Sequence, residues 1–309
     1  MTSQEPLLVQ RSSYIKKSFS FISLPHQKAY QSKMINNYYL GFAYQGTSSG
    51  YFIMTGRNNS FILINPFTRR KMVINNSTFK VDFSCFSCQV LLAFSRGSED
   101  FVLVVLCKNS DNLHVYQSRN RGWVTYLTSH KVVDFVVLHN TIYVLTKKAN
   151  IGLLSLNSAN INFLKLKSTP IVPFTSYSHV RLVSCDGLLL VVNVMSTQIF
   201  NVYKIDFSTM DYVKLETLGD IALFYAPRKK YYALSNPRKW GYEYNSVYVI
   251  DLPSDKYRVY KGDDNQIPKI TLPFVFLQLQ VPCASPLSKR YLDWCFRHIH
   301  YEVDYSLDN

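Results

Sequence analysis

The sequence predicts an all-β protein, a single β-propeller of four-stranded antiparallel blades, and three observations favour this fold. Short apolar runs separated by turn residues recur in groups of four along the chain. The groups repeat at roughly 40–50 residues, which is the length of one propeller blade. No segment has the apolar period of a long amphipathic helix. A β-sandwich also contains many short strands, but the four-strand period favours the propeller.

The clearest hairpin is residues 61–74, FILINPFTRRKMVI. Its first strand ends at Asn65-Pro66, because proline lacks the N–H that a sheet ladder needs and restricts the residue before it. Residues 68–71 form a polar turn, and the apolar run then resumes. This pattern predicts a β-hairpin with a short loop.

Five groups of four strands follow one another from Tyr38 to Tyr260. Their first strands begin near residues 38, 90, 132, 180 and 221, so the period is about 41–52 residues. Turn-forming residues separate most strands. The expected strands are 38–44, 51–55, 61–65 and 70–74; 90–94, 101–107, 113–117 and 123–127; 132–138, 141–146, 151–156 and 161–166; 180–185, 188–194, 199–206 and 212–215; 221–225, 231–234, 247–252 and 256–260.

The two ends of the chain hold strands without partners. Residues 19–24 and 28–31 are strand-like at the N-terminal end, and residues 271–279 and 291–303 are strand-like at the C-terminal end. Unpaired edges invite aggregation, so we expect these segments to form a sixth, composite blade that closes the ring. The expected organisation is a disordered tail over 1–17, a propeller over 18–303 and a tail over 304–309.

Composition points to a cytoplasmic or nuclear protein. The 309 residues include 34 basic and 20 acidic residues, for a net charge of +14. This charge could fit an acidic partner, but it is spread along the chain and not clustered, which favours a generally basic, soluble surface. No signal peptide and no membrane-length apolar run occur. The six cysteines are therefore expected to be reduced thiols.

No motif meets the requirements of a catalytic, metal or cofactor site. Residues 46–50 match G-x-S-x-G, but a strand follows them where the nucleophile elbow needs a helix, so Ser48 is expected to be a turn residue. Cys85 and Cys88 form C-x-x-C without a second pair of zinc ligands at suitable spacing. The sequence predicts a protein that is not an enzyme and binds no cofactor.

The loop over residues 236–245 is the candidate partner-binding site. It carries cations beside aromatic residues, the types that anchor protein interfaces; they are Arg238, Lys239, Trp240, Tyr242 and Tyr244. In a propeller, the loops between the second and third strands of every blade lie on one face. Both this loop and Lys147-Lys148 are in such positions, so we expect them on the same face. The basic loops at Arg69–Lys71, Arg96, Arg119, Arg121 and Arg228–Lys230 fall on the opposite face. Two alternatives are that the aromatics fold back onto their own blade, or that they stack on nucleobases.

Three segments resemble a known family. ILINPFTRRKMVI, VSCDGLLLVV and VYKIDFSTMDYVKLETLGDIALFYA, in that order, resemble the plant F-box-associated β-propellers of the KIB type. In the segment over 218–224, Ile221 replaces the usual basic residue of the family. The resemblance implies a propeller that presents substrates to a ubiquitin ligase. The 17 residues before the first expected strand are too few for an F-box, so we expect the propeller alone.

The leading hypothesis is a non-catalytic propeller that binds another protein, similar to the substrate-recognition part of an F-box protein. The alternative is a basic nuclear or nucleic-acid-associated binding protein. The two differ in salt dependence, because charge-driven binding weakens steeply as salt rises.

Overall fold

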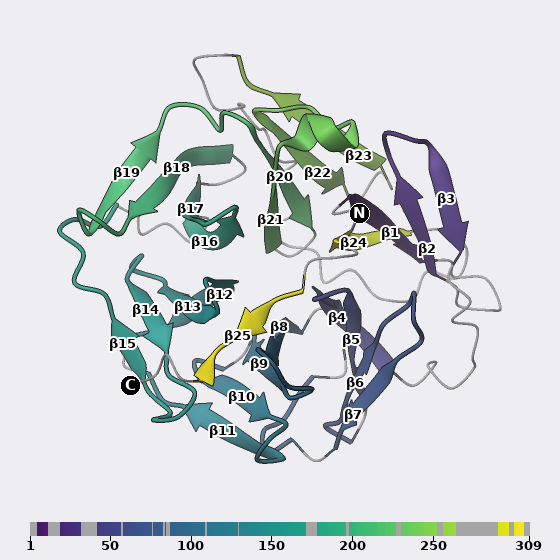
Figure 1. The fold of residues 1–309 in the computed structure, drawn as a ribbon, viewed down its shortest axis with the longest axis vertical. Helices are drawn as coiled ribbons and strands as arrows, with labels where there is room; N and C mark the ends of the chain where they lie inside the picture. The colour runs from purple at the N-terminus through teal and green to yellow at the C-terminus, as the bar shows by residue number, and fades with distance from the viewer. Residues whose placement is uncertain are drawn as a thin grey trace. The chain divides into compact units, whose positions relative to one another are not determined.

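The computed structural model describes most of the chain and shows an all-β architecture (Figure 1). The described residues are 5–11, 19–31, 42–56, 58–75, 77–82, 84, 87–108, 110–128, 130–170, 178–195, 198–226, 230–251, 256–263, 290–296 and 300–305. These ranges include the short 3₁₀ helix η2 (Pro237–Trp240). Among the described residues, no helical segment has the length and hydrophobicity that a transmembrane helix requires.

One compact unit contains residues 1–127 and 280–302, and it holds three sheets in the described part of the chain. The composite blade has the order β24 (Arg290–Phe296), β1 (Pro6–Arg11), β2 (Phe19–Ser23), β3 (Lys28–Gln31). The first blade consists of β4 (Phe42–Ser48), β5 (Tyr51–Gly56), β6 (Phe61–Ile64) and β7 (Lys71–Ile74). The second blade consists of β8 (Cys88–Ser95), β9 (Phe101–Cys107), β10 (Leu113–Gln117) and β11 (Gly122–Tyr126), with β25 (Glu302–Val303) added beside β8.

The other unit contains residues 128–279 and 303–309, and its described residues also form three sheets. The third blade consists of β12 (Val132–Leu138), β13 (Thr141–Thr146), β14 (Ile151–Leu154) and β15 (Ile161–Phe163). The fourth consists of β16 (Ser178–Cys185), β17 (Leu188–Met195), β18 (Gln198–Asp206) and β19 (Asp211–Leu215). The fifth consists of β20 (Ile221–Ala226), β21 (Lys230–Ser235), β22 (Ser246–Asp251) and β23 (Lys256–Lys261). The expected six blades of four strands are therefore confirmed.

The composite blade joins the two ends of the chain, as expected, but with a different division of strands. It takes three strands from the N-terminal end and one from the C-terminal end, because β1 lies between β24 and β2. Leu8 pairs with Ile22 on one side and with Trp294 on the other. The expectation of a disordered tail over residues 1–17 is thus wrong for Pro6–Arg11. The expected strand over 271–279 lies outside the described residues.

The fifth blade departs from the antiparallel meander that the sequence predicts. Its order is β21-β20-β22-β23, and β20 and β22 run parallel. Residues 236–245 join β21 to β22, which lie on opposite sides of β20, so this loop passes over the end at which β20 begins. At the edge of its sheet, β21 packs against the fourth blade, where Tyr231 and Ala233 share an apolar cluster with Val183.

The first blade shows how strand alternation builds the core. Ile62 and Ile64 on one face of β6 pack in a cluster with Phe21 of the composite blade. Phe61 and Leu63 on the other face pack with residues of the second blade. Successive side chains of a strand point to opposite faces, so β6 is buried on both sides, and the expected burial of Ile62 and Ile64 between blades is confirmed.

Buried polar side chains connect neighbouring blades within each unit. Asp293 Oδ2 accepts a hydrogen bond of 3.1 Å from Thr47 N, which joins β24 to β4. Gln45 Oε1 accepts one of 3.0 Å from Cys88 N, which joins β4 to β8. Asp134 Oδ2 accepts one of 3.0 Å from Leu182 N, so β12 and β16 are joined in the same way. We call these three side chains the blade clips.

Candidate functional site

The loop over 236–245, which we call the crossover loop, begins with a tightly defined turn. Asn236 has φ 49° and ψ 50°, a left-handed conformation that asparagine tolerates better than most residues. Its N–H donates to Asp220 O at 3.0 Å. Pro237 then occupies the start of η2, where its missing N–H is no loss. Gly241, at φ 78°, ends the helix and donates to Arg238 O at 3.1 Å.

The loop ends at Asn245, which is buried and holds three backbone segments together. Its N–H donates to Gly219 O at 3.1 Å. Its side chain accepts a hydrogen bond of 3.0 Å from Leu218 N and donates one of 2.6 Å to Asp263 O. This role of Asn245 was not predicted from the sequence, although an asparagine at each end of the loop is a signal for turn conformations.

Tyr242 anchors the middle of the crossover loop to the blade beneath it. Its side chain is 3% exposed. The ring packs edge-on against Phe224, with centroids 5.2 Å apart, and against Tyr248, with centroids 5.1 Å apart. The structure therefore removes Tyr242 from the expected binding residues, because this aromatic does fold back onto its own blade.

The other predicted residues of the loop remain at the surface. The Arg238 guanidinium carbon lies 3.9 Å from the centroid of the half-buried Tyr244 ring, a cation–π contact. Lys239 Nζ lies 5.4 Å from the centroid of Trp240, which is also half-buried. Arg238 and Lys239 are exposed. The cations thus stack on aromatic rings that the loop holds in place.

Lys147 and Lys148 are exposed in the turn between β13 and β14. Lys147 N donates to Lys131 O at 2.8 Å, so this turn lies beside the residue that leads into β12. The crossover loop likewise bonds to Gly219 and Asp220, which lead into β20. Both loops therefore lie at the end of their sheets where the chain enters the blade, which agrees with the face deduced from strand phase.

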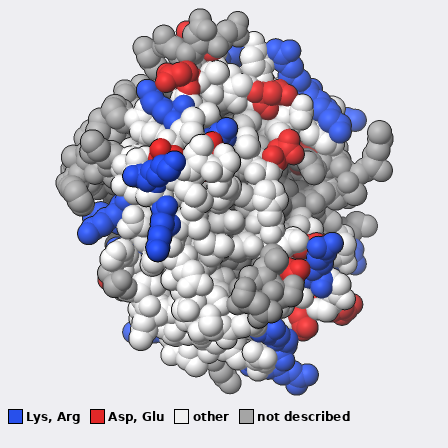
Figure 2. All heavy atoms as spheres, turned by 60° about the vertical axis from the view of Figure 1, so that its left-hand side comes forward, with Lys and Arg blue, Asp and Glu red and all other residues white. Residues whose placement is uncertain are grey.

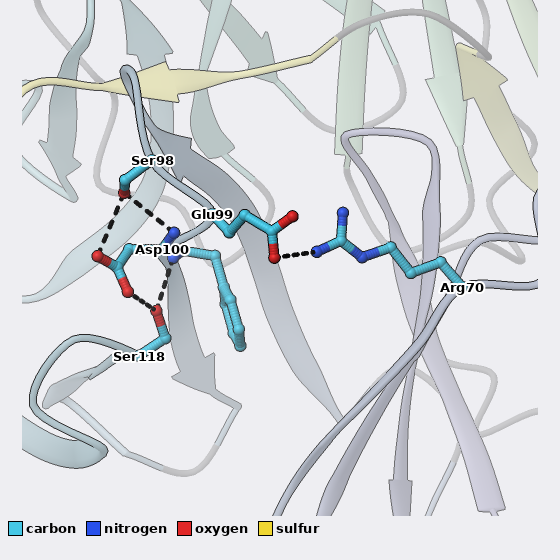
Figure 3. Close-up of polar contacts among 6 residues, drawn as sticks. Arg70, Ser98, Glu99, Asp100 and Ser118 are labelled. Carbon is cyan, nitrogen blue, oxygen red and sulfur yellow. Dashed lines mark hydrogen bonds and ion pairs between the residues drawn. The ribbon is translucent and has the colours of Figure 1, made fainter.

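A second basic surface lies at the opposite, hairpin end of the first and second blades. Arg70 Nη2 lies 3.4 Å from Glu99 Oε2 and connects the β6–β7 and β8–β9 loops (Figure 3). Ser118 connects the latter to the β10–β11 loop: its hydroxyl donates to Asp100 Oδ1 at 3.1 Å and accepts from Phe101 N at 2.8 Å. The three-loop surface carries six exposed cations: Arg69, Arg70, Lys71, Arg96, Arg119 and Arg121. Arg228 and Lys229, expected on this face, lie outside the described residues.

The charged residues on one face of the molecule are dispersed. Figure 2 shows a face on which Lys and Arg lie in several separate groups, some of them beside Asp or Glu, around a broad area of uncharged residues. This distribution agrees with the spread of basic residues along the sequence. The net charge of +14 is therefore distributed over several groups of basic residues, and the binding capacity of each group depends on the residues within it.

The motifs considered for chemistry have structural roles. Ser48 is buried at the end of β4, where its Oγ accepts a hydrogen bond of 2.9 Å from Leu92 N. It connects the first and second blades, and it is the last residue of β4 rather than the turn residue that was expected, since the turn consists of Ser49 and Gly50. Cys88 is buried in β8, and Cys85 lies outside the described residues. Within the described ranges, no group of three His, Cys, Asp or Glu side chains is arranged to hold a metal ion.

Comparison with known proteins identifies one family. Residues 21–261 match the model of the KIB1-4 beta-propeller family. No curated protein matches the sequence.

Solved structures match this chain at low identity. AztD from Citrobacter koseri has 12% identity and a TM-score of 0.39, and the alignment covers 63% of this chain and 51% of that one. The chain thus spans about half the length of AztD. A nidogen/laminin complex has 9% identity over 95% of this chain and 100% of that chain, with a TM-score of 0.49. TolB from Acinetobacter baumannii has 11% identity over 94% and 66%, with a TM-score of 0.48.

Proposed function

Because the chain belongs to the KIB1-4 β-propeller family, we propose that it is a non-catalytic module that binds another protein through the crossover loop of its fifth blade. The observation that supports this proposal is the arrangement of Arg238 and Lys239 on the rings of Tyr244 and Trp240. By resemblance to F-box-associated propellers, the bound protein is a substrate of a ubiquitin ligase in the cytoplasm or nucleus.

The crossover loop has the properties of an efficient recognition element. Trp, Tyr and Arg dominate the residues that carry binding energy in protein interfaces. The loop is held at both ends by Asn236 and Asn245 and in the middle by Tyr242. Little conformational entropy is then lost on binding, which favours affinity. The exposed cations suit a partner surface with carboxylates beside apolar groups.

The test is affinity purification of the tagged full chain from its own cells, with the wild type and Trp240→Ala compared. We expect Trp240→Ala to lose the captured protein while its melting temperature stays nearly unchanged. The matched control is Arg119→Ala, which removes an exposed cation from the three-loop surface and should leave capture intact. Unchanged capture by Trp240→Ala would contradict the proposal, and a large fall in its melting temperature would make Trp240 a packing residue.

A second candidate function is polyanion binding at the three-loop surface, which is favoured by its six exposed cations against Glu99 and Asp100. Arginine forms bidentate contacts with phosphates and carboxylates. Binding of a fluorescent single-stranded RNA should then weaken steeply between 50 and 200 mM salt. Arg119→Glu should weaken it further, and Trp240→Ala should not. Equal binding of the RNA by both variants would show that the three-loop surface is not the binding site.

A further inference from the structure

Two buried cysteines face each other across the second blade. Cys88 at the start of β8 and Cys107 at the end of β9 are direct cross-strand partners. Their Sγ atoms are 3.1 Å apart, and both are free thiols. Their side chains lie on the same face of the sheet, because residues paired in this register point the same way.

The hydrogen-bond pattern shows that the backbone already suits a disulfide at this position. Lys108 N donates to Ser87 O at 2.9 Å, so residues 87 and 108 form a hydrogen-bonded pair. Pairs alternate along an antiparallel ladder, so Cys88 and Cys107 form a non-hydrogen-bonded pair, where Cα atoms are roughly 4.5 Å apart. Disulfides bridge Cα atoms about 4.4–6.8 Å apart. The sulfurs can therefore close to bonding distance by side-chain rotation.

We propose that Cys88 and Cys107 form a reversible cross-strand disulfide when the protein meets hydrogen peroxide. In the first step the sulfur of Cys88 attacks a peroxide oxygen, the O–O bond breaks, and a sulfenic acid and one water form. In the second step the sulfur of Cys107 attacks the sulfenic sulfur and releases a second water. The two thiols lose two electrons and two protons in total, and the peroxide is reduced to two waters.

The surroundings of the pair distinguish the two sulfurs. Hydrogen bonds from Cys107, the larger effect, and from Ser87 lower the pKa of Cys88, against the opposing effect of burial. The same hydrogen bond and burial raise the pKa of Cys107. The thiolate is the nucleophile in thiol chemistry. Either order of attack gives the same disulfide because the two sulfurs are 3.1 Å apart, and Cys88 is written as the attacking sulfur because the Ser87 Oγ lies 3.7 Å from it.

The disulfide would form beside one of the blade clips. Cys88 N donates to Gln45 Oε1 at 3.0 Å, so the backbone of Cys88 is bonded to the side chain that joins β4 to β8. Oxidation therefore ties β9 to the point where Gln45 holds the first blade against β8. The other described cysteines have no cysteine opposite them: Cys185 pairs with Leu188, and Cys295 pairs with Leu7.

Peptide mapping of the full chain tests the proposal. The reduced protein is treated with one equivalent of hydrogen peroxide, its remaining thiols are blocked with N-ethylmaleimide, and it is digested without reduction. We expect a peptide pair linked through Cys88 and Cys107, two hydrogens lighter than the reduced pair and separated by dithiothreitol. Cys107→Ser should abolish this link, and Cys185→Ser should leave it unchanged.

Two results would overturn the proposal: recovery of both cysteines with the maleimide attached, or a link from Cys88 to Cys85, its neighbour in the C-x-x-C motif. A Cys85→Ser variant shows which cysteine is the partner of Cys88. If the partner is Cys107, this variant should retain the link. The wild-type map needs no substituted protein, so the test stands even if Cys107→Ser fails to fold.

Discussion

At the scale of single residues, the blade clips place polar groups where apolar ones would be expected. Asp134 and Arg181 are 9% and 7% exposed, and both contact the backbone of the neighbouring blade. The carboxyl group of Asp134 accepts a hydrogen bond from Leu182 N, and Arg181 Nη1 donates to Val133 O at 2.6 Å. Burying such groups is costly unless they are hydrogen-bonded. They therefore specify which strands meet more than they add to stability.

Asp134 should make stability depend on pH. Burial raises the pKa of its carboxyl above the usual value, and the charge of Arg181 offsets this only in part. The folded state then holds a proton that the unfolded state, with a pKa of about 3.9, has lost. The contribution of Asp134 is fully present below that pKa and is lost as pH rises through the raised pKa of the folded state.

The measurement is the unfolding free energy of the wild type and of Asp134→Asn in urea from pH 4 to 8. The wild-type value minus the variant value should fall as pH rises. The asparagine of the variant does not titrate, so the loss of the negative charge near Arg181 changes the free-energy difference by the same amount at every pH. The dependence of the difference on pH therefore reports the ionisation of Asp134 alone. A difference that rises with pH would mean that Arg181 outweighs burial.

At the scale of elements, the crossover loop combines a packing function with an exposed surface. The loop must pass over the end of β20, because β21 and β22 lie on opposite sides of that strand. Tyr242 and the two terminal asparagines hold it, so the residues of η2 are presented at the surface. The same ten residues therefore contain both structural and candidate binding positions. Substitution of single residues can distinguish an effect on stability from an effect on binding.

Tyr242→Ala should destabilise the protein without any partner present. Removal of this ring leaves a cavity beside Phe224 and Tyr248, and loss of a buried aromatic costs about 3–5 kcal/mol. The control is Tyr257→Ala on β23 of the same blade, where the side chain is 40% exposed and the expected cost is below about 1 kcal/mol. Urea unfolding of both variants checks the difference, and equal values would show that the loop does not pack as described.

At the scale of the whole molecule, the composite blade connects residues that are far apart in sequence. Leu8 and Trp294, both fully buried, are paired although almost the whole chain separates them. Contacts of this kind form late, because a long loop must close before they stabilise the fold. The composite blade is thus the part of the molecule most sensitive to truncation.

Deletion of residues 1–11 should lower the melting temperature by at least ~5 °C and promote aggregation. It removes β1 and leaves facing edges on β24 and β2 unpaired. A synthetic peptide of residues 1–11, added in excess, should restore part of the loss by strand addition, and the same peptide with Leu8→Asp should not. Calorimetry and light scattering check both effects. A truncated protein as stable and soluble as the full chain would show that β1 is dispensable.

The strands themselves could be read from the sequence. Residues 101–107, 113–117, 132–138 and 141–146 are strands with the expected bounds, because alternation and turn residues act locally.

Tertiary structure decided which segments pair. The second partner of β1, the strand β24, lies at the other end of the chain, and the parallel order of the fifth blade depends on β20 lying between β21 and β22. The burial of Tyr242 and the meeting of Cys88 with Cys107 follow from register. Pairing and register depend on the surfaces of distant segments, so no local pattern contains them.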